Sequence, residues 1–272
     1  MSWQYSSSLA RPTRITHPNG SIETFSLGTL GRVITHKYSA DGVDRITTYE
    51  YNEQGLLSKV NGPKAGDSDV TSFNYSTTKQ LVSIVDGLGH TTTFSNYNGF
   101  GEPTLIEDAN GVKTSLQFDH DGRVTRIAVD TEGNDSVVYT FAYDSVGRLV
   151  NQSMPSGETL VYQYDAANRL TSIQDAEGNY VGYDYDAAGN ATSIEVVDSQ
   201  NQILYLQNRV FDQNNRLKEL TNSLQNTWTL EYDQHDNLVK ANTPLQTSFS
   251  YLYDSLNRVI ETTERDGSKT SS

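Results

Sequence analysis

The residues best suited to chemistry in this sequence are aspartates and arginines that stand four positions apart, directly after a tyrosine. In "YDAANRL" (residues 164–170), Asp165 precedes Arg169 by four residues. "YDSVGRL" contains Asp144 and Arg148 at the same spacing. A carboxylate can act as a general base, and a guanidinium can bind a phosphate or an oxyanion. Taken alone, such a pair is a candidate catalytic site.

The same pair occurs in five copies, whereas a catalytic constellation is normally formed once, in one cleft. Repetition therefore favours a structural interpretation. Each aspartate would cap its own turn, while each arginine would pair with it or lie over a tyrosine ring. We predict no catalytic residues and no enzymatic activity. The other copies of the pair are Asp119 with Arg123, Asp212 with Arg216, and Asp254 with Arg258.

The tyrosine that opens each copy defines a repeat. Successive copies are 24, 22, 21, 25, 21, 21, 26, 21 and 21 residues apart, which gives a base period of 21 with small insertions. Self-similarity at a fixed period of this length indicates a repeat architecture. The anchor positions are Tyr51, Tyr75, Tyr97, Phe118, Tyr143, Tyr164, Tyr185, Phe211, Tyr232 and Tyr253, with a weaker copy at Leu27.

Each position of the repeat has a physical interpretation. The anchor closes a run with apolar residues at every second position, such as Leu160, Tyr162 and Tyr164, which is typical of a half-buried strand. The following Asp or Asn starts an Asx turn, and Gly or Asn three positions later predicts a residue with positive φ. Lys79 and Asp236 depart from the Gly or Asn rule. The motif residues of the later copies are Tyr143, Asp144, Gly147, Arg148, Tyr164, Asp165, Asn168, Arg169, Tyr185, Asp186, Gly189, Asp212, Asn215, Arg216, Tyr232, Asp233, Tyr253, Asp254, Asn257 and Arg258.

A second strand and a second turn complete the unit. An aliphatic residue after the arginine begins the strand, as in "RLTSIQD", and a turn such as "DANG" (108–111), "DTEGN" (130–134) or "DAEGN" (175–179) ends it. Strand, turn, strand and turn every 21 residues predict an all-β array of about 22 short antiparallel strands with no helix. We expect one domain over residues 1–272, with clear repeats over about 25–265 and no internal linker.

These motifs resemble the YD repeat of the RHS family. That family includes bacterial polymorphic toxins, the B and C components of insecticidal toxin complexes, and the teneurins. The resemblance implies that about 11 repeats form a curved, spiral ribbon, which would be part of a shell. In full-length relatives such a shell encloses a C-terminal toxin or other cargo. It therefore implies a structural module whose partners are an effector cargo or further repeats of a larger shell.

The sequence departs from full-length relatives in three ways. It has fewer repeats, no conserved core segment that closes the shell, and no effector domain. It also starts and stops within the repeat pattern, which predicts a truncated array with unprotected sheet edges that are prone to self-association. If it belongs to a full-length protein, that protein is expected to be secreted or on the cell surface.

Composition excludes several classes of function. The formal net charge of −14 and the absence of a basic cluster argue against nucleic acid as a partner. No run of about 18 apolar residues predicts a membrane span, and the first residues lack the apolar core of a signal peptide. There are no cysteines, the five histidines share no metal-ligand spacing, and the acidic turns do not fit an EF-hand loop. We predict no cofactor and no metal site.

The aromatic residues leave one alternative open. Aromatic rings can stack on sugars, so the array could be a carbohydrate-binding or surface-binding module. Tyrosines that alternate toward one face are more simply explained as packing within the ribbon. Trp228 and Tyr180 are the candidates for contact with a glycan, because they stand outside the anchor positions.

Overall fold

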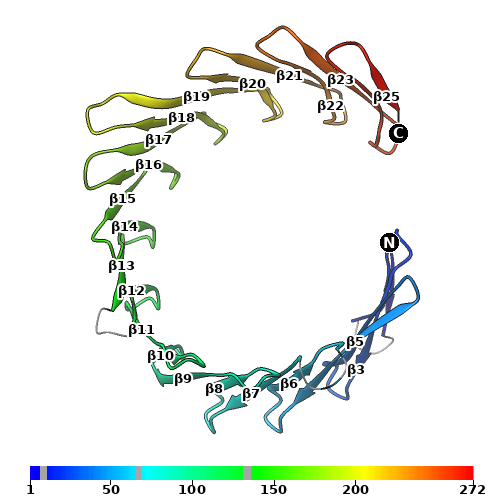
Figure 1. The fold of residues 1–272 in the computed structure, drawn as a ribbon, viewed down its shortest axis with the longest axis vertical. Helices are drawn as coiled ribbons and strands as arrows, with labels where there is room; N and C mark the ends of the chain where they lie inside the picture. Colours follow the sequence, from blue (N-terminus) through cyan, green and yellow to red (C-terminus); the bar gives the residue numbers. More distant parts are fainter. Residues whose placement is uncertain (7–10, 65, 67–68, 131–135, 272) are drawn as a thin grey trace. The chain divides into compact units, whose positions relative to one another are not determined.

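The computed structural model describes residues 1–6, 11–64, 66, 69–130 and 136–271. All regular structure in these residues is β-strand, with no helix (Figure 1). The strands are β1 (Ser2–Tyr5), β2 (Pro12–Thr16), β3 (Ile22–Leu27), β4 (Val33–Ala40), β5 (Val43–Tyr51), β6 (Leu57–Asn61), β7 (Val70–Tyr75), β8 (Leu81–Val85), β9 (Thr91–Tyr97), β10 (Pro103–Glu107), β11 (Lys113–Phe118), β12 (Val124–Val129), β13 (Val137–Tyr143), β14 (Leu149–Ser153), β15 (Thr159–Tyr164), β16 (Leu170–Asp175), β17 (Tyr180–Tyr185), β18 (Ala191–Val197), β19 (Ile203–Phe211), β20 (Leu217–Asn222), β21 (Thr227–Tyr232), β22 (Leu238–Asn242), β23 (Ser248–Tyr253), β24 (Val259–Thr263) and β25 (Lys269–Ser271).

The chain divides into two compact units, Met1–Tyr139 and Thr140–Ser272, and the boundary falls within β13. In the first unit, β1 to β11 each pair antiparallel with the next strand in the sequence. The same neighbour-to-neighbour pairing runs through the second unit from β13 to β25. Within each unit the sheet bends gradually along the strand order (Figure 1).

The turn after each anchor has one conformation throughout. Its fourth residue has a positive φ, for example 65° at Asn168. Lys79 and Asp236, which break the Gly or Asn rule, adopt the same conformation with φ of 67° and 65°. The turn is therefore imposed by the hairpin register and does not require the preferred residue types. Where the turn meets the strands, the ladder shifts by one residue, between Gln163 and Tyr164 in the hairpin of β15 and β16.

The sheet has almost no core. Of the described residues, only Ile15, Ser21, Gly31, Val70, Ala128, Gly182 and Val197 are buried. The chain exposes 17526 Å², whereas a compact globular protein of this mass, 30.2 kDa, exposes roughly 12,000 Å². Among the described residues, each strand contacts only its neighbours in the sequence, so each unit is a single layer of sheet. Its stability must come from bonds between adjacent strands and repeats.

The predicted all-β array of antiparallel hairpins is confirmed. The structure has 25 strands where the repeat pattern predicts about 22, because short strands also form before the first clear repeat and after the last. The turn predicted at "DTEGN" lies largely outside the described residues. The assignment of residues 1–272 to a single domain stays a prediction.

Candidate functional site

The aspartate of the repeat closes the turn that follows it. Asp165 Oδ1 accepts hydrogen bonds from the backbone N–H groups of Ala167 (2.8 Å) and Arg169 (2.9 Å). Its Oδ2 accepts a hydrogen bond from Arg169 Nε at 2.7 Å. The Asx turn expected at this position is therefore present, and the carboxylate has a donor on each oxygen. The same 2.7 Å bond from Arg Nε to Asp Oδ2 is found for Arg123 with Asp119, Arg148 with Asp144, Arg216 with Asp212 and Arg258 with Asp254.

The arginine extends from its own turn to the next repeat. The guanidinium of Arg169 lies 4.6 Å from the centre of the Tyr185 ring and donates to the Asp186 carbonyl at 2.9 Å. Arg148 lies over the Tyr164 ring in the same way, at 4.8 Å. A cation over the face of a tyrosine ring is attracted to it, so the arginine clamps one repeat onto the next. We call this arrangement of Asp, Arg and the following Tyr the bracket.

Two copies of the bracket use asparagine in place of arginine. Asn190 Nδ2 donates to Asp186 Oδ2 at 2.9 Å and to Asn215 Oδ1 at 3.0 Å. Asn237 Nδ2 donates to Asp233 Oδ2 at 2.9 Å, and to Asn257 Oδ1 at 3.0 Å. The shorter amide thus keeps both the bond within the turn and the bond to the next turn.

The anchor tyrosine supplies a second link between repeats. Tyr164 Oη donates to the Leu149 carbonyl at 2.9 Å, and Tyr185 Oη donates to the Leu170 carbonyl at 2.7 Å. In each case the acceptor is the aliphatic residue that starts the second strand of the preceding repeat. The other bonds of this kind join Tyr51 to Val33 (2.9 Å), Tyr75 to Leu57 (3.0 Å), Tyr232 to Leu217 (2.9 Å) and Tyr253 to Leu238 (2.9 Å), and Tyr97 bonds to Leu81.

Hydrogen bonding stabilises the charged form of the bracket aspartates. The backbone N–H of Arg169 and its guanidinium lower the pKa of Asp165, and Arg148 does the same for Asp144. For Asp212, the guanidinium of Arg216 is the main cause of the lowered pKa. A general base works best when its pKa lies near the working pH, so these carboxylates are poorly suited to that role. The contacts of these residues join neighbouring repeats to each other.

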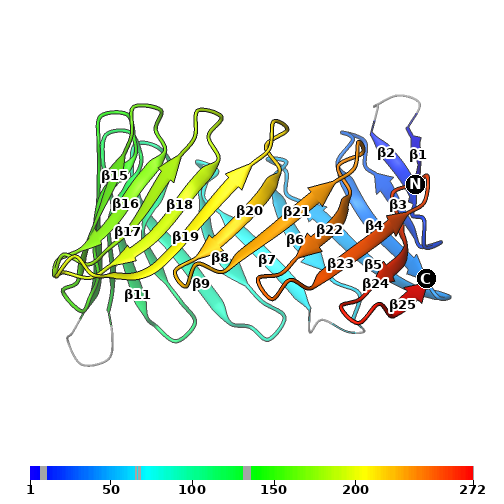
Figure 2. The same ribbon diagram turned by 90° about the horizontal axis from the view of Figure 1, so that it is seen from above.

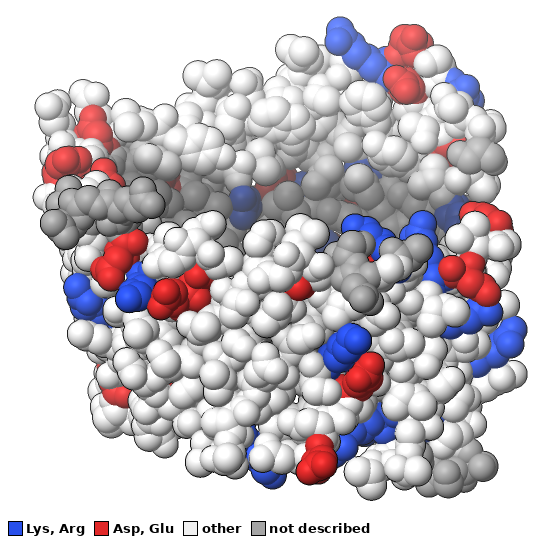
Figure 3. All heavy atoms as spheres, turned by 60° about the horizontal axis from the view of Figure 1, so that its bottom comes forward, with Lys and Arg blue, Asp and Glu red and all other residues white. Residues whose placement is uncertain are grey.

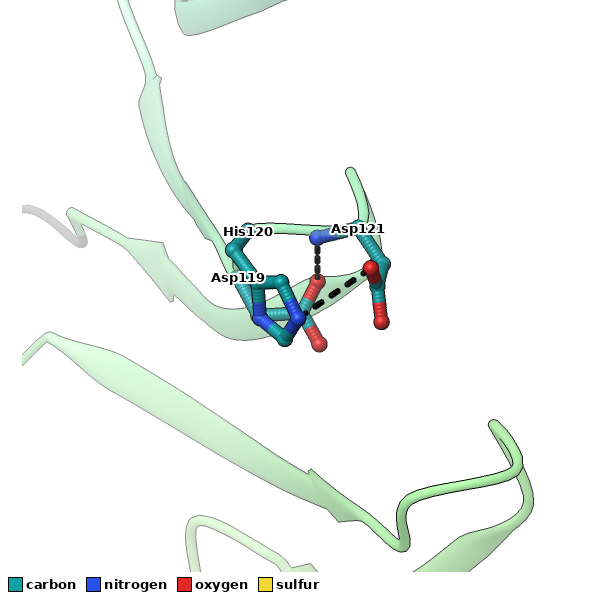
Figure 4. A group of neighbouring side chains, drawn as sticks. All are labelled: Asp119, His120 and Asp121. Atoms are coloured by element: carbon teal, nitrogen blue, oxygen red, sulfur yellow. Dashed lines mark hydrogen bonds and ion pairs between the residues drawn. The ribbon is translucent and has the colours of Figure 1, made fainter.

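A small acidic cluster lies at one of these turns. Ligating atoms of Asp119, His120 and Asp121 lie within 4.8 Å of one another (Figure 4). The guanidinium of Arg123 lies 2.7 Å from Asp119 and 3.0 Å from Asp121. Because a cation already contacts both carboxylates, the cluster is a poor place for a metal ion.

A second cluster was not expected from the sequence. The carboxylate of Glu23 lies between two imidazoles, 2.7 Å from His17 Nε2 and 2.8 Å from His36 Nε2. These contacts, led by the one with His17, lower the pKa of Glu23. The ring of Phe25 stacks on His36 with centroids 4.7 Å apart. His17 directly follows β2, Glu23 and Phe25 occupy alternate positions of β3, and His36 lies opposite Phe25 in β4.

The two residues predicted to contact a glycan are half-buried. Tyr180 Oη donates to Glu195 Oε1 at 2.9 Å, and this bond raises the pKa of Tyr180. Trp228 lies in β21 opposite Leu220 of β20. The structure does not bring Trp228 and Tyr180 together, because they lie in different hairpins. Contact with a glycan stays a prediction.

Comparison with known proteins agrees with the fold. The family model described as Teneurin YD-shell matches residues 70–271. No curated protein matches the chain. Solved structures of the TcdB2-TccC3 complex match: one with Cdc42 has a TM-score of 0.66 and 17% identity over 92% of this chain, and one with TEV has 0.67 and 16% over 95%.

A Tc holotoxin pore of Photorhabdus luminescens matches with a TM-score of 0.57 and 13% identity over 97% of this chain. The chain spans only 16% of the first two solved chains and 19% of the third. At these identities the matches show a shared fold. The family model covers most of the chain. The chain belongs to the Teneurin YD-shell family.

Proposed function

We propose that this array is a stretch of the wall of a shell that encloses a toxin or effector polypeptide. The observation that carries the proposal is the link between repeats. Anchor hydroxyls bond back to the preceding repeat, and arginines such as Arg169 clamp forward onto the next one. Such links hold a single layer of sheet together without a core, as a thin wall requires.

The wall is proposed to act without catalysis. Its most chemistry-like residues, Asp165 and Arg169, are bonded to each other and to neighbouring backbone. Their copies serve the same contacts in successive turns, which supports a structural role for the whole set. On the face shown in Figure 3, acidic and basic side chains are scattered among neutral ones.

Limited proteolysis of the natural polypeptide that contains this array tests the proposal. Mass spectrometry would follow the cleavage of segments outside the repeats. We expect such a segment to be cut slowly in the wild type and quickly when Tyr164→Ala and Tyr185→Ala are combined, because the wall would open. The control pair Val146→Ser and Leu256→Ser changes exposed turn residues and should leave the protection intact. Equal cleavage rates in all three proteins would rule out enclosure.

Carbohydrate binding is kept as the second candidate for the Trp228 and Tyr180 region. Binding to a glycan array that is lost in Trp228→Ala would support it. The half-buried position of both rings favours the wall over this candidate.

The described residues include no helix long and apolar enough to span a bilayer. The partners proposed for this wall are polypeptides, either further repeats of a larger shell or a cargo.

A further inference from the structure

One edge of the second unit carries a row of exposed apolar side chains. Ile203, Leu204 and Tyr205 begin β19 and are 41 to 64% exposed. Leu224 and Leu245, at the tips of turns 222–225 and 243–246, are 79% and 75% exposed. We call these five residues the apolar edge strip. Soluble proteins seldom leave large apolar side chains clustered in water without a use for them.

The strand at this strip has a free backbone edge. On one side, β19 pairs with β18 as far as Ile203. On the other side, the ladder with β20 begins only at Gln207. Just before this ladder, the Ser223 side chain bonds to the backbone of Leu206. Its Oγ accepts a hydrogen bond from Leu206 N at 2.6 Å and donates one to the Leu206 carbonyl at 3.1 Å. Residues 203–205 therefore have no strand beside them on that side, within the part of the second unit that is described.

The turns place the strip along one line. The two bonds of Ser223 to Leu206 fix turn 222–225 against the start of β19, which brings Leu224 next to the free edge. Turn 243–246 is the next turn along the same edge. Figure 2 shows the turns between β18 and β19, β20 and β21, and β22 and β23 following one another along the lower border of the sheet. The strip is continuous with the free strand edge.

Acidic residues lie at one end of the strip. Glu158, Asp175 and Glu177 line a hollow of about 420 Å³, with Leu160 and Ala176. Turn 175–178 lies against the turn that leads into β19, because Ser199 N donates to Asn179 Oδ1 at 2.9 Å. A partner that follows the edge thus passes from apolar side chains to a negatively charged hollow.

We propose that this edge binds an extended segment of a partner protein that combines apolar side chains with lysine or arginine. The segment adds as a short strand beside residues 203–205 and packs its apolar side chains on Leu224 and Leu245. Its basic side chain enters the acidic hollow. Adding a strand to an exposed sheet edge is a common mode of peptide recognition. A second copy of this chain fits less well, because it would bring two acidic edges together. The proposal does not depend on whether the array encloses a cargo.

A library of random twelve-residue peptides displayed on phage provides the test. Peptides selected on the wild-type chain would be synthesised and their affinities measured by fluorescence anisotropy. We expect sequences that combine apolar residues with Lys or Arg, and at least tenfold weaker binding by the double variant Leu224→Ser with Leu245→Ser. Both residues are turn tips outside the strand ladder, so the variant should keep its fold, which circular dichroism would check.

The matched control is Val146→Ser with Leu256→Ser. These side chains are 68% and 70% exposed and occupy turn tips of the second unit, in turns that follow an anchor. Binding should be unchanged in this control, and Glu158→Gln with Glu177→Gln should weaken binding and reduce its dependence on salt. The proposal is overturned if no peptide is enriched, or if selected peptides bind both double variants equally. It is also overturned if sedimentation shows a dimer of the wild type that Leu224→Ser with Leu245→Ser converts to a monomer.

Discussion

The two units of the array link their repeats through the same tyrosine hydroxyl but differ in what lies against the tyrosine ring. In the second unit, brackets follow one another with arginine or asparagine at the clamp position. In the first unit, Arg32 lies over the Tyr51 ring, but Leu56, Gln80 and Glu102 occupy the clamp position in the three repeats that follow. Tyr75 and Tyr97 of that unit nevertheless donate to the Leu57 and Leu81 carbonyls. The hydroxyl bond therefore forms without the arginine.

The turns show the same difference. Where the clamp is missing, a neutral side chain closes the turn: Asn52 accepts from Leu56 N at 2.9 Å, and Ser76 accepts from Gln80 N at 3.1 Å. After each anchor of the second unit, an aspartate is used and Arg or Asn follows four residues later, as at Asp165 and Asp186. The tyrosine hydroxyl bond is therefore the basic link between repeats, and the charged bracket is a reinforcement concentrated in the second unit.

Low pH should produce the largest difference in stability between the two units. Hydrogen bonds lower the pKa of the bracket aspartates, so their folded-state pKa lies below the ordinary value of 3.8. Their contribution to stability is complete above about pH 4 and is lost as the pH falls through the lowered pKa. The aspartates of this kind in the second unit are Asp144, Asp165, Asp186, Asp212, Asp233 and Asp254.

Hydrogen exchange measured by mass spectrometry at pH 7, 4 and 2.5 can follow each unit separately, after correction for the intrinsic exchange rate. We expect β14 to β25 to lose protection below pH 4 before β4 to β10 do. The first unit has fewer such carboxylates, with Glu23, Asp86 and Asp119 among them. Equal loss in both units, or earlier loss in the first, would contradict the assignment of the charged bracket as a reinforcement of the second unit.

Removing an anchor ring should have the next largest effect. Tyr185→Ala deletes a half-buried ring, its bond to Leu170 and the surface on which Arg169 lies, and we expect a loss of about 3 kcal/mol in local stability. Tyr75→Ala deletes a ring with no arginine over it and should cost about 2 kcal/mol. Hydrogen exchange of the flanking strands measures both losses. If the two losses are equal, the arginine contributes nothing through the ring.

Removing only the hydroxyl should affect both units alike. Tyr185→Phe and Tyr75→Phe each delete one bond to a backbone carbonyl and should each cost about 1 kcal/mol. Phe118 and Phe211 show that the anchor position accepts a ring without a hydroxyl. The same exchange measurement applies, and a clearly larger loss for Tyr185→Phe would mean that the hydroxyl and the arginine act together.

The fold and the turns could be predicted from the sequence because they depend on spacing. The 21-residue period, the alternation before Tyr164 and the position of Asn168 specify hairpins and their left-handed corners. The bond from each anchor hydroxyl could not be predicted, because its acceptor is a backbone carbonyl that has no residue signature. The cluster of His17, Glu23 and His36 was missed because strand register, not sequence spacing, brings these side chains together.

The free edge beside Ile203 was missed for a related reason. The sequence shows that the hairpin is lengthened at residues 199–208. It does not show that β20 ends earlier than β18, which leaves the start of β19 open on one side. Pairing partners of a strand depend on where the neighbouring turns fall, and turn positions vary between repeats through small insertions.

Introducing the bracket into the first unit by two substitutions should change stability least. Ser76→Asp with Gln80→Arg recreates the aspartate and arginine of the second unit in front of Tyr97. The hydroxyl of Tyr97 bonds to Leu81 as that of Tyr185 bonds to Leu170, so the new guanidinium should reach the ring as Arg169 does. An exposed cation over a tyrosine contributes about 0.5–1 kcal/mol, and we expect a gain of that size in the hydrogen-exchange stability of β8 and β9 at pH 7. The gain should disappear below pH 4, when the new aspartate is protonated.

Gln80→Arg alone is the control, because it adds the cation without the carboxylate that orients it. An equal gain from the single variant would show that the ring contact alone, without the aspartate, makes the bracket.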